Sequence, residues 1–349
     1  MIFKTFFKIG FFICALCSVS WAQMLTSSAS PKYFEFEWKS LYAPIRIKSD
    51  ADSALFIQNI DQLEQWTNRF SHFFQRNGPL DSLIFNAKKG DTLQLDSMTL
   101  NLLRFGLNAR KVTQGDVDIG IGNLIDAWGL NWGGKRKIPS DSLRRRLVSE
   151  LKNPPFTLTQ SGIIINRSHV HLSLGSYLES RILSQIAHTL LHCHAKNFLI
   201  EVGGDFQFLG KNPQNKPWTL AIKDPTHPSQ VLATLTLDRW QSGGFSTSGS
   251  YEQNFVDSLG HFHHHIFNPK TGKSSNGPLA VSVLSPQPLT NDLLDTWFMI
   301  APFSTSHSYI KSHSNSIHAF IVQDNHQIWI SPQLRKSISN LADHWKIIQ

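Results

Sequence analysis

STSGSY at residues 246–251, HHHIFNPKTG at 263–272 and NDLLDT at 291–296 are three polar segments set between short apolar runs. We interpret this stretch as one wall of an active site. In NDLLDT, the carboxylate of Asp292 and the hydroxyl of Thr296 project from the same face of a helix, one turn apart. Two hard oxygens on one face suit Mg²⁺, which completes its shell with water and substrate phosphate. The pattern implies a phosphate-bearing ligand, although Asp292 as a capping or first-turn acid also explains the hexapeptide alone.

The first 22 residues have the pattern of a secretory signal peptide. Two lysines precede an apolar run over residues 9–19, and Ser20-Trp21-Ala22 places small residues at the positions that determine cleavage. We expect an exported, periplasmic protein, associated with the inner membrane if this segment is retained. A lipoprotein is the alternative, but Cys14 and Cys17 lack the small residues that precede a lipidated cysteine. No other stretch approaches the roughly 20 apolar residues of a membrane span.

The composition narrows the classes of partner. The chain has 349 residues and a formal net charge of +8, but its basic residues are scattered apart from residues 135–137 and 144–146, and no aromatic-and-basic module accompanies them. This argues against nucleic-acid binding and is compatible with an anionic small ligand. After signal cleavage Cys193 is the sole thiol, so no internal disulfide can form, and its apolar neighbours predict a buried side chain.

Helical and strand patterns are mixed without strict alternation, which favours an α+β fold over a doubly wound sheet. Apolar positions with a period near 3.6 predict helices over residues 54–74, 97–112, 178–191 and 291–300. Short apolar runs predict strands at 45–47, 163–165, 170–174, 198–202, 218–222, 232–237, 280–284, 319–322 and 327–330. We expect one domain over residues 41–349, preceded by the signal peptide (1–22) and a linker (23–40).

Several polar residues have two interpretations. Asp118, in a glycine-rich segment, either contacts a ligand or caps a helix. Asp295 is interpreted as a surface acid or one behind the metal ligands. Ser246 and Ser248 are not in a Gly-x-Ser-x-Gly elbow, so a turn that holds phosphate or adenosine is favoured over a serine nucleophile. The three histidines at 263–265 alternate in direction on a strand, so they are not expected to bind one ion.

The segments, in their order, resemble the ApbE family of FAD:protein FMN transferases, which move the FMN half of FAD onto a threonine or serine hydroxyl of exported flavoproteins. The resemblance runs from about residue 41 to 330. It is carried by TQGDVDIGIGNLIDAWG (113–129), EVGGD (201–205), PWTLAIKDP (217–225), STSGSYEQNF (246–255), HHIFNPKTG (264–272) and the pair Asp292 and Thr296. It implies a mixed α/β, T-fold-related architecture with an FAD and Mg²⁺ site in a cleft between closely joined lobes.

The resemblance also implies roles for individual residues. Asp292 and Thr296 match the family's magnesium ligands, and Ser176 falls where the family supplies a backbone carbonyl as a third. His265 and Asp292 match catalytic positions. The residues expected to contact FAD, which is the substrate, are Leu41, Phe73, Asp116, Val117, Asp118, Ser173, Glu179 and His265.

This sequence departs from the family pattern at several of these positions. Ser173 replaces an aspartate, Glu179 a frequent lysine, Asn268 an aspartate and Asp116 an alanine, and Leu41-Tyr42-Ala43 stands in place of Met-Gly-Thr. The departures leave two alternatives to flavin transfer. One is a catalytically degenerate FAD-binding protein, and the other is an FAD pyrophosphatase that yields FMN and AMP.

The implied reaction is attack by an acceptor hydroxyl on the FMN-side phosphorus of FAD, with AMP leaving. A pyrophosphate needs charge neutralisation and an in-line nucleophile more than covalent help, so a metal ion would supply much of the catalysis. His265 is expected to polarise a phosphate or assist transfer of the acceptor proton, because histidine titrates near neutral pH. Alternatively, it only hydrogen-bonds the adjacent turn. The expected partner is a flavoprotein that presents a threonine or serine, through which membrane association would arise.

Overall fold

The computed structural model describes residues 33–40, 43–131 and 133–348. The signal peptide expected over residues 1–22 and the FAD contact expected at Leu41 lie outside these residues. Within the described part of the chain, no helix combines the length and apolar character needed to cross a bilayer.

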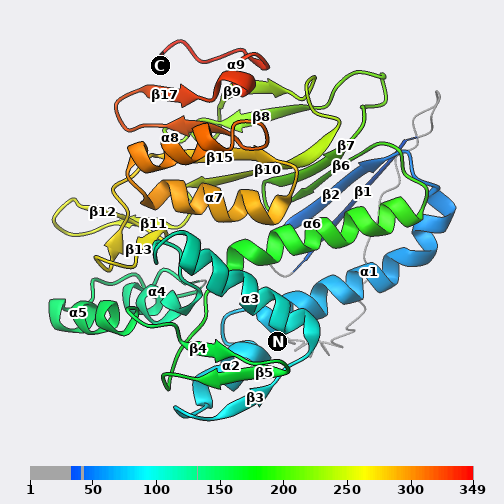
Figure 1. Cartoon of the computed structure of the whole chain (residues 1–349). Helices are drawn as coiled ribbons and strands as arrows, with labels where there is room; N and C mark the ends of the chain where they lie inside the picture. Colours follow the sequence, from blue (N-terminus) through cyan, green and yellow to red (C-terminus); the bar gives the residue numbers. More distant parts are fainter. Residues whose placement is uncertain (1–32, 41–42, 132, 349) are drawn as a thin grey trace, which may run out of the picture.

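Nine strands of the described chain form the main sheet, which fills the upper part of Figure 1. Neighbouring strands are antiparallel except the last pair, which is parallel. The spatial order is β1 (Phe34–Lys39), β2 (Pro44–Ser49), β6 (Phe198–Val202), β7 (Asp205–Leu209), β10 (Ser242–Gly249), β15 (Ala280–Ser285), β16 (His318–Val322), β17 (Gln327–Ile330) and β19 (Lys346–Ile348). β10 and β15 are therefore central strands.

Helices cover one face of this sheet in two layers. α7 (Pro288–Ile300) packs on β10 and β15, and α6 (Gly175–His192) packs on β6 and against α7. α1 (Ser53–Phe74) lies outside α6, so α6 is sandwiched between α1 and the sheet (Figure 1). This position explains why apolar residues occur on more than one side of α6.

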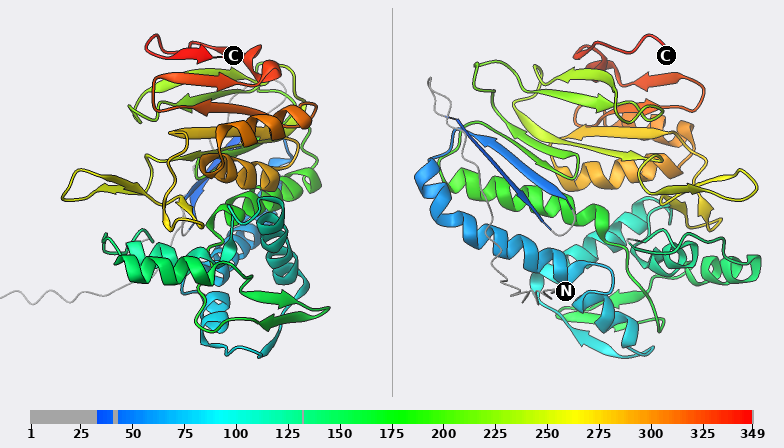
Figure 2. Two further views of the ribbon diagram at one scale, coloured as in Figure 1. Left: turned by 60° about the vertical axis from the view of Figure 1, so that its left-hand side comes forward. Right: turned by 180° about the vertical axis from the view of Figure 1, so that it is seen from behind.

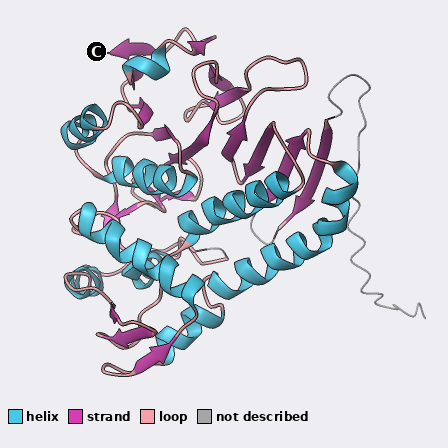
Figure 3. Cartoon of the chain, turned by 45° about the vertical axis from the view of Figure 1, so that its right-hand side comes forward, coloured by secondary structure: helices cyan, strands magenta, loops and turns pink. Residues whose placement is uncertain are grey.

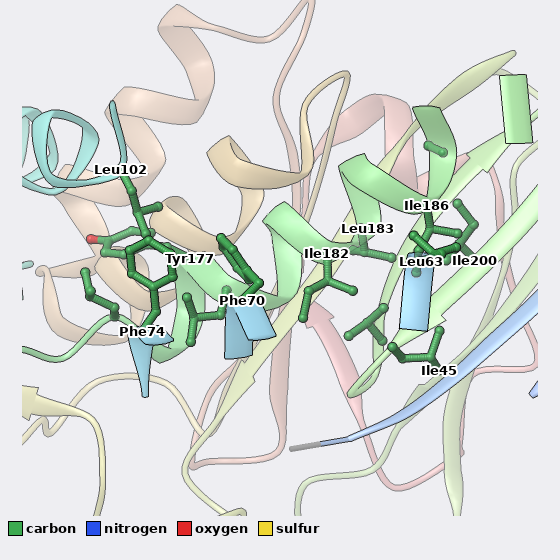
Figure 4. Packing of buried hydrophobic residues seen from close by; sticks show 14 of the residues in the cluster. Ile45, Leu63, Phe70, Phe74, Leu102, Tyr177, Ile182, Leu183, Ile186 and Ile200 are labelled. Carbon is green, nitrogen blue, oxygen red and sulfur yellow. The ribbon is translucent and has the colours of Figure 1, made fainter. Parts of the chain in front are cut away.

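The core between these layers consists of aliphatic and aromatic side chains. Figure 4 shows Leu63, Phe70 and Phe74 of α1 facing Ile182, Leu183 and Ile186 of α6, with Ile45 and Ile200 from the sheet near Leu63 and Ile186. Each of these side chains is at most 4 % exposed, and burying one contributes about 1.5–3 kcal/mol to folding. This packing fixes α6 between α1 and the sheet.

Smaller units surround the main body. Figure 3 shows the longer helices between the main sheet and a small sheet. The small sheet contains β3 (Thr92–Gln94), β5 (Gly162–Ile165) and β4 (Phe156–Leu158), beside α2 (Pro79–Asn86) and α3 (Ser97–Val112). A second one contains β18 (Ile338–Ser339), β9 (Val231–Thr236) and β8 (Thr219–Lys223).

Two hairpins follow β10 in the chain. β11 (Asn254–Val256) pairs with β12 (Phe262–His264), and β13 (Phe267–Asn268) pairs with β14 (Lys273–Ser274). The β11–β12 hairpin projects from the body in both views of Figure 2. The remaining short elements are η1 (Ile119–Ile121), α4 (Gly122–Trp128), α5 (Asp141–Glu150), α8 (Phe303–Ser312) and α9 (Pro332–Arg335).

The mixed α+β fold expected from the sequence is confirmed, but three local predictions were wrong. Residues 34–39, expected within a linker, form β1, whose alternating side chains are buried against the core. Residues 170–174 form no strand, and β5 pairs instead with β3 and β4. Ser246 and Ser248 lie in the central strand β10 and not in a turn. Cys193 is buried, as expected.

The side chain of Asp81 connects three segments of the chain through an ion pair and hydrogen bonds. Its carboxylate, 2 % exposed, forms an ion pair with Arg76 and accepts hydrogen bonds from the amides of Asn77 (2.9 Å) and Leu172 (2.7 Å). It also lies 2.9 Å from Nδ1 of His171. Burial raises the pKa of this carboxyl, but the His171 and amide hydrogen bonds and Arg76 outweigh it and leave the pKa below its usual range.

We expect Asp81→Asn to lower the free energy of unfolding at pH 7 by about 2–3 kcal/mol, because charge-assisted hydrogen bonds are lost. A carboxyl whose folded pKa is depressed stabilises the protein above its unfolded pKa, and this contribution disappears as pH falls through the folded pKa. The two proteins should therefore converge in stability below about pH 4. Urea unfolding at a series of pH values checks this, and a constant difference down to pH 3 would contradict it.

Candidate functional site

The site is built on one face of α7. Asp292, Asp295 and Thr296 occupy positions i, i+3 and i+4, so they share the face that packs on β10 and α6. Asp292 is 5 % exposed and Asp295 1 % exposed. The other face of α7 carries Leu294 and Phe298, which anchor the helix in the core beneath β15 and β16. The helix is thus fixed by apolar contacts while three oxygen-bearing side chains converge on the opposite side.

Serine hydroxyls from two other elements contact these groups. Ser180 of α6 donates a hydrogen bond to Oδ2 of Asp292. Ser248 of β10 donates to Oδ1 of Asp295 at 3.0 Å and lies 3.2 Å from the Thr296 hydroxyl. Of the two interpretations of Asp295, the surface acid is wrong because its side chain is buried, whereas a place behind the expected metal ligands agrees with its contacts to Ser248 and Thr296.

Glu179 and Asp205 complete a cluster of four acids with Asp292 and Asp295. Burial, followed by repulsion from Asp295, raises the pKa of Glu179 to about 7, and burial raises that of Asp295 to about 7. Burial and the neighbouring carboxylates raise the pKa values of Asp205 and Asp292 well above their usual range. Among the described residues, no lysine, arginine or histidine forms an ion pair with any of the four.

This donor set fits a hard divalent cation. Buried carboxylates are stable when they are paired or when they coordinate a metal, and no cationic side chain in the described part of the chain pairs with these. The Asp292 carboxylate and the Thr296 hydroxyl supply two oxygens, a number that suits Mg²⁺ with its retained waters and substrate oxygens. The structure therefore supports the interpretation of Asp292 as a ligand over that of a helix cap, because its side chain caps no described helix.

Ser176, the third ligand expected from the sequence, fits a metal-binding role less well than Asp292 and Thr296 do. Ser176 lies in the first turn of α6, which begins at Gly175, and not in a turn before the helix. A carbonyl within a helix normally accepts a hydrogen bond from the amide four residues later, which leaves it less free to bind an ion. The ligand role of Ser176 stays a prediction, while Ser180, one turn further along α6, is a contact of Asp292 that the sequence analysis missed.

The segment Asp116-Val117-Asp118 lies next to α7 and α6. Asp116 accepts a hydrogen bond from Nε1 of Trp297 at 3.2 Å and lies 2.7 Å from Nζ of Lys270. Val117 packs against the core that contains Trp297. The amide of Ser173 donates to the carbonyl of Ile119 at 2.8 Å. Four residues expected to contact FAD, namely Asp116, Val117, Ser173 and Glu179, thus lie on adjoining segments around the cluster.

Asp118 has the role of a cap in this structure. Its Oδ1 accepts the amide of Gly120 at 2.8 Å at the start of η1, and its Oδ2 pairs with Arg110 of α3. The carboxylate is fully buried, with 0 % of its side chain exposed. The structure therefore favours the capping interpretation over direct contact with a flavin.

His265 lies just after β12. Burial and the neighbouring His264 lower its pKa to about 4, so the ring is neutral at physiological pH. Its Nδ1 is buried and has no hydrogen-bond partner among the described residues, while its amide donates to Gln253. A neutral ring with an unpaired nitrogen is suited to hydrogen-bond a ligand. His263 and His264 contact Asp257 and the Ser275 carbonyl respectively, so the run does not converge on one ion, as expected.

Phe73 is the expected contact least connected to the cluster. It lies near the end of α1 and packs edge-on against Phe74, with ring centres 4.9 Å apart. It borders the core that contains α1 and α6 and is only partly buried. Its proposed contact with the flavin stays a prediction.

Two hollows flank the NPKTG loop (residues 268–272). One, about 520 Å³, is lined by five cationic side chains, Arg144, Arg145, Lys152, Lys270 and Lys273. The other, about 410 Å³, lies between this loop and the end of α7. Lys270 joins the first hollow to Asp116. A positive hollow that reaches Asp116 through Lys270 favours an anionic ligand.

The Gly203-Gly204 turn places Asp205 and leaves room for Glu179. β6 and β7 are joined by these two residues, with φ of +64° and +101°, the pattern of a tight type I′ hairpin. A Cβ on Gly203 would lie 2.6 Å from Oε1 of Glu179. The turn thus accounts for the glycine pair in EVGGD.

We expect Gly203→Ala to lower the free energy of unfolding by about 1–3 kcal/mol, from backbone strain and the clash with Glu179. Gly204→Ala is a matched control, because its φ is also positive but no atom lies within 4 Å of the added Cβ. Denaturant unfolding of both variants separates the two causes. If both variants lose the same unfolding free energy, the clash with Glu179 contributes nothing to the loss in Gly203→Ala.

Comparison with known proteins gives a consistent result. The ApbE family model matches residues 40–321. FAD:protein FMN transferase from Haemophilus influenzae is 23 % identical over 276 residues, covering 77 % of this chain and 79 % of the relative, and the enzyme of that name from Klebsiella pneumoniae is 26 % identical over 314 residues, covering 86 % and 83 %. The ApbE protein of Thermotoga maritima superposes with a TM-score of 0.75 at 21 % identity, covering 88 % of this chain and all of that one. The flavin transferase ApbE from Vibrio cholerae gives 0.73 at 18 % identity, covering 90 % and 99 %.

Proposed function

The chain belongs to the ApbE family, and on that premise we propose that it is a transferase that moves the FMN moiety of FAD onto a threonine or serine hydroxyl of an exported flavoprotein, releasing AMP. We propose further that the reaction depends on Mg²⁺ and takes place in the periplasm. The observation that carries the proposal is the cluster of four acids, of which Asp205, Asp292 and Asp295 are buried and Glu179 is half-buried. The cluster lacks a protein cation among the described residues and displays Asp292 and Thr296 on one helix face. Such a cluster favours a cation, and a cation favours a phosphate substrate.

In the proposed reaction, the acceptor hydroxyl oxygen forms a bond to the FMN-side phosphorus. The bond from that phosphorus to the oxygen of the AMP phosphate breaks, and AMP leaves with the electron pair. A bound Mg²⁺ would neutralise charge on the phosphate oxygens. Asp292 and Thr296 would hold the ion, and Ser180 and Ser248 orient these two side chains through their hydrogen bonds.

His265 is proposed to orient the phosphate or the acceptor hydroxyl. Because its pKa is about 4, the ring is a hydrogen-bonding group at neutral pH and a poor general base. The proton lost by the hydroxyl therefore passes to a carboxylate of the cluster that does not hold the ion, and Glu179 is the candidate we propose. Asp116 and Ser173, on the adjoining segments, would line the flavin.

The test uses the purified protein with FAD, Mg²⁺ and a flavoprotein acceptor that presents a threonine. We expect an acceptor band whose flavin fluorescence survives a denaturing gel, with AMP released in equal amount. An acceptor with valine in place of that threonine is the matched control and should stay unlabelled. Free FMN with no labelled band would instead identify a pyrophosphatase, and tightly bound, intact FAD would identify a binding protein.

A further inference from the structure

A second group of metal-ligating side chains lies at the C-terminal edge of the fold, outside the acid cluster. Asp224 and His227 belong to the turn between β8 and β9, and His344 precedes β19. One donor atom from each residue lies within 4.8 Å of the other two. Figure 1 shows β8, β9 and the C-terminal segment together at the top of the molecule, whereas the acid cluster is formed by β10, α6 and α7.

The turn that carries Asp224 and His227 is held by side-chain and backbone hydrogen bonds. Asp224 is fully buried, and its Oδ1 accepts the amides of Thr226 at 2.8 Å and His227 at 3.2 Å. The turn is closed by a backbone hydrogen bond from Asp224 to Gln230 and another from Gln230 to His227. Metal sites gain affinity when their ligands are held before the ion arrives.

The C-terminal segment is held against this turn from both sides of His344. The amide of Ala342 donates to Leu232 of β9, and the amide of Lys346 donates to the carbonyl of His326. Nε2 of His344 and Nε1 of Trp345 both lie 3.0 Å from Oδ2 of Asp224. Even without an ion, Asp224 holds the C-terminal segment in place through these two contacts.

A structural role for Asp224 explains His344 and Trp345, whereas the ring of His227 contacts Thr226, whose Oγ1 lies 3.1 Å from its Nδ1, and forms no hydrogen bond with Asp224. Nδ1 of His227 lies 4.0 Å from Oδ1 of Asp224, too far for a hydrogen bond. The rings of His227 and His344 are 5.8 Å apart between centres. Two imidazoles that bind one zinc ion through Zn–N bonds of about 2.0 Å have ring centres roughly 5–6 Å apart. The pair is therefore spaced as it would be around a shared ion.

We propose that Asp224, His227 and His344 form a binding site for a divalent transition metal of the zinc class, which clamps the C-terminal segment onto the β8–β9 turn. Two imidazoles and a carboxylate are a donor set that zinc accepts, with water in the fourth position. Asp224 binds through Oδ2, while its Oδ1 keeps the hydrogen bonds of the turn. The His344 ring proton moves from Nε2 to Nδ1 so that Nε2 faces the ion. The site is independent of the proposed transfer reaction.

The test is a titration of the full protein with Zn²⁺ in competition with a chromophoric chelator, with Mg²⁺ in excess to occupy the acid cluster. We expect His227→Gln and His344→Gln each to weaken the tightest zinc site at least tenfold, and Zn²⁺ to raise the melting temperature of the parent protein but not that of these two variants. Both histidines have exposed side chains, so the variants should fold, which circular dichroism without metal checks.

The matched control is the double substitution His261→Gln with His263→Gln. These histidines also flank a carboxylate, Asp257, at 3.2 and 3.0 Å, but lie in the projecting hairpin. The control should retain the tight site and its thermal shift. The proposal is overturned if the His227 and His344 variants bind Zn²⁺ as tightly as the parent, or if only the control loses binding.

Discussion

Asp292→Asn is expected to reduce flavin transfer about a thousandfold while raising the thermal stability of the metal-free protein. The loss follows from removal of the charged ligand, because metal stabilisation of a phosphoryl transition state is worth several kcal/mol and about 1.4 kcal/mol corresponds to tenfold in rate. Burial, together with repulsion from Asp205, Asp295 and Glu179, raises the pKa of Asp292. The folded protein therefore disfavours the charged form of this carboxyl, and its removal should increase stability. Asparagine has nearly the same shape as aspartate but removes one of four crowded charges. The variant would therefore gain stability and lose activity.

Two measurements together test this result. Gel fluorescence of the acceptor reports activity, and thermal unfolding with chelator or with Mg²⁺ reports the ion. Mg²⁺ should stabilise the parent protein and leave the variant unchanged. Asp81→Asn is the matched chemical control, since the same substitution at a buried but ion-paired carboxylate should lower stability. A variant that keeps its activity, or keeps the Mg²⁺ shift, would refute the metal site on Asp292.

The part of the site on α7 could be predicted because a helix places residues four apart on one face, a rule that needs no tertiary information. Ser180, Asp205 and Ser248 could not be assigned this way. They come from three elements distant in the sequence, and only the packing of α6, α7, β7 and β10 brings them together. For Asp205 a signal was present, since the glycine pair in EVGGD predicts a tight turn that delivers the next residue to a fixed place.

The fold was predictable where burial follows a simple period. α1, α3 and α6 have clear helical periodicity, and their bounds agree within a few residues. β10 was missed because Ser, Thr and Gly dominate SGGFSTSG, a composition that by itself favours a turn. Its strand conformation comes from pairing with β7 and β15 on either side, a tertiary effect that local propensity does not contain.

Arg110→Met is expected to lower the free energy of unfolding by about 3 kcal/mol at neutral pH. Arg110 pairs with Asp118 and also donates to the Lys152 carbonyl at 2.8 Å. Removing one partner of a buried pair leaves the other charge uncompensated, which typically costs about 3–5 kcal/mol. We expect the lower end because Arg167 also attracts the Asp118 carboxylate. The loss should loosen the Asp116–Asp118 segment next to α7 and weaken FAD binding as well.

The pH dependence of this loss identifies its cause. Burial already raises the pKa of Asp118, with Arg110 opposing it, so removing Arg110 raises the folded pKa further. A carboxyl with a raised folded pKa destabilises the protein above that pKa, and the penalty disappears as pH falls below the unfolded value. The deficit of Arg110→Met should therefore shrink between pH 8 and pH 4. Adding Asp118→Asn should restore much of the stability at pH 8, because the unpaired charge is gone. A deficit that is the same at every pH, and is not rescued by Asp118→Asn, would show that Arg110 acts through packing alone.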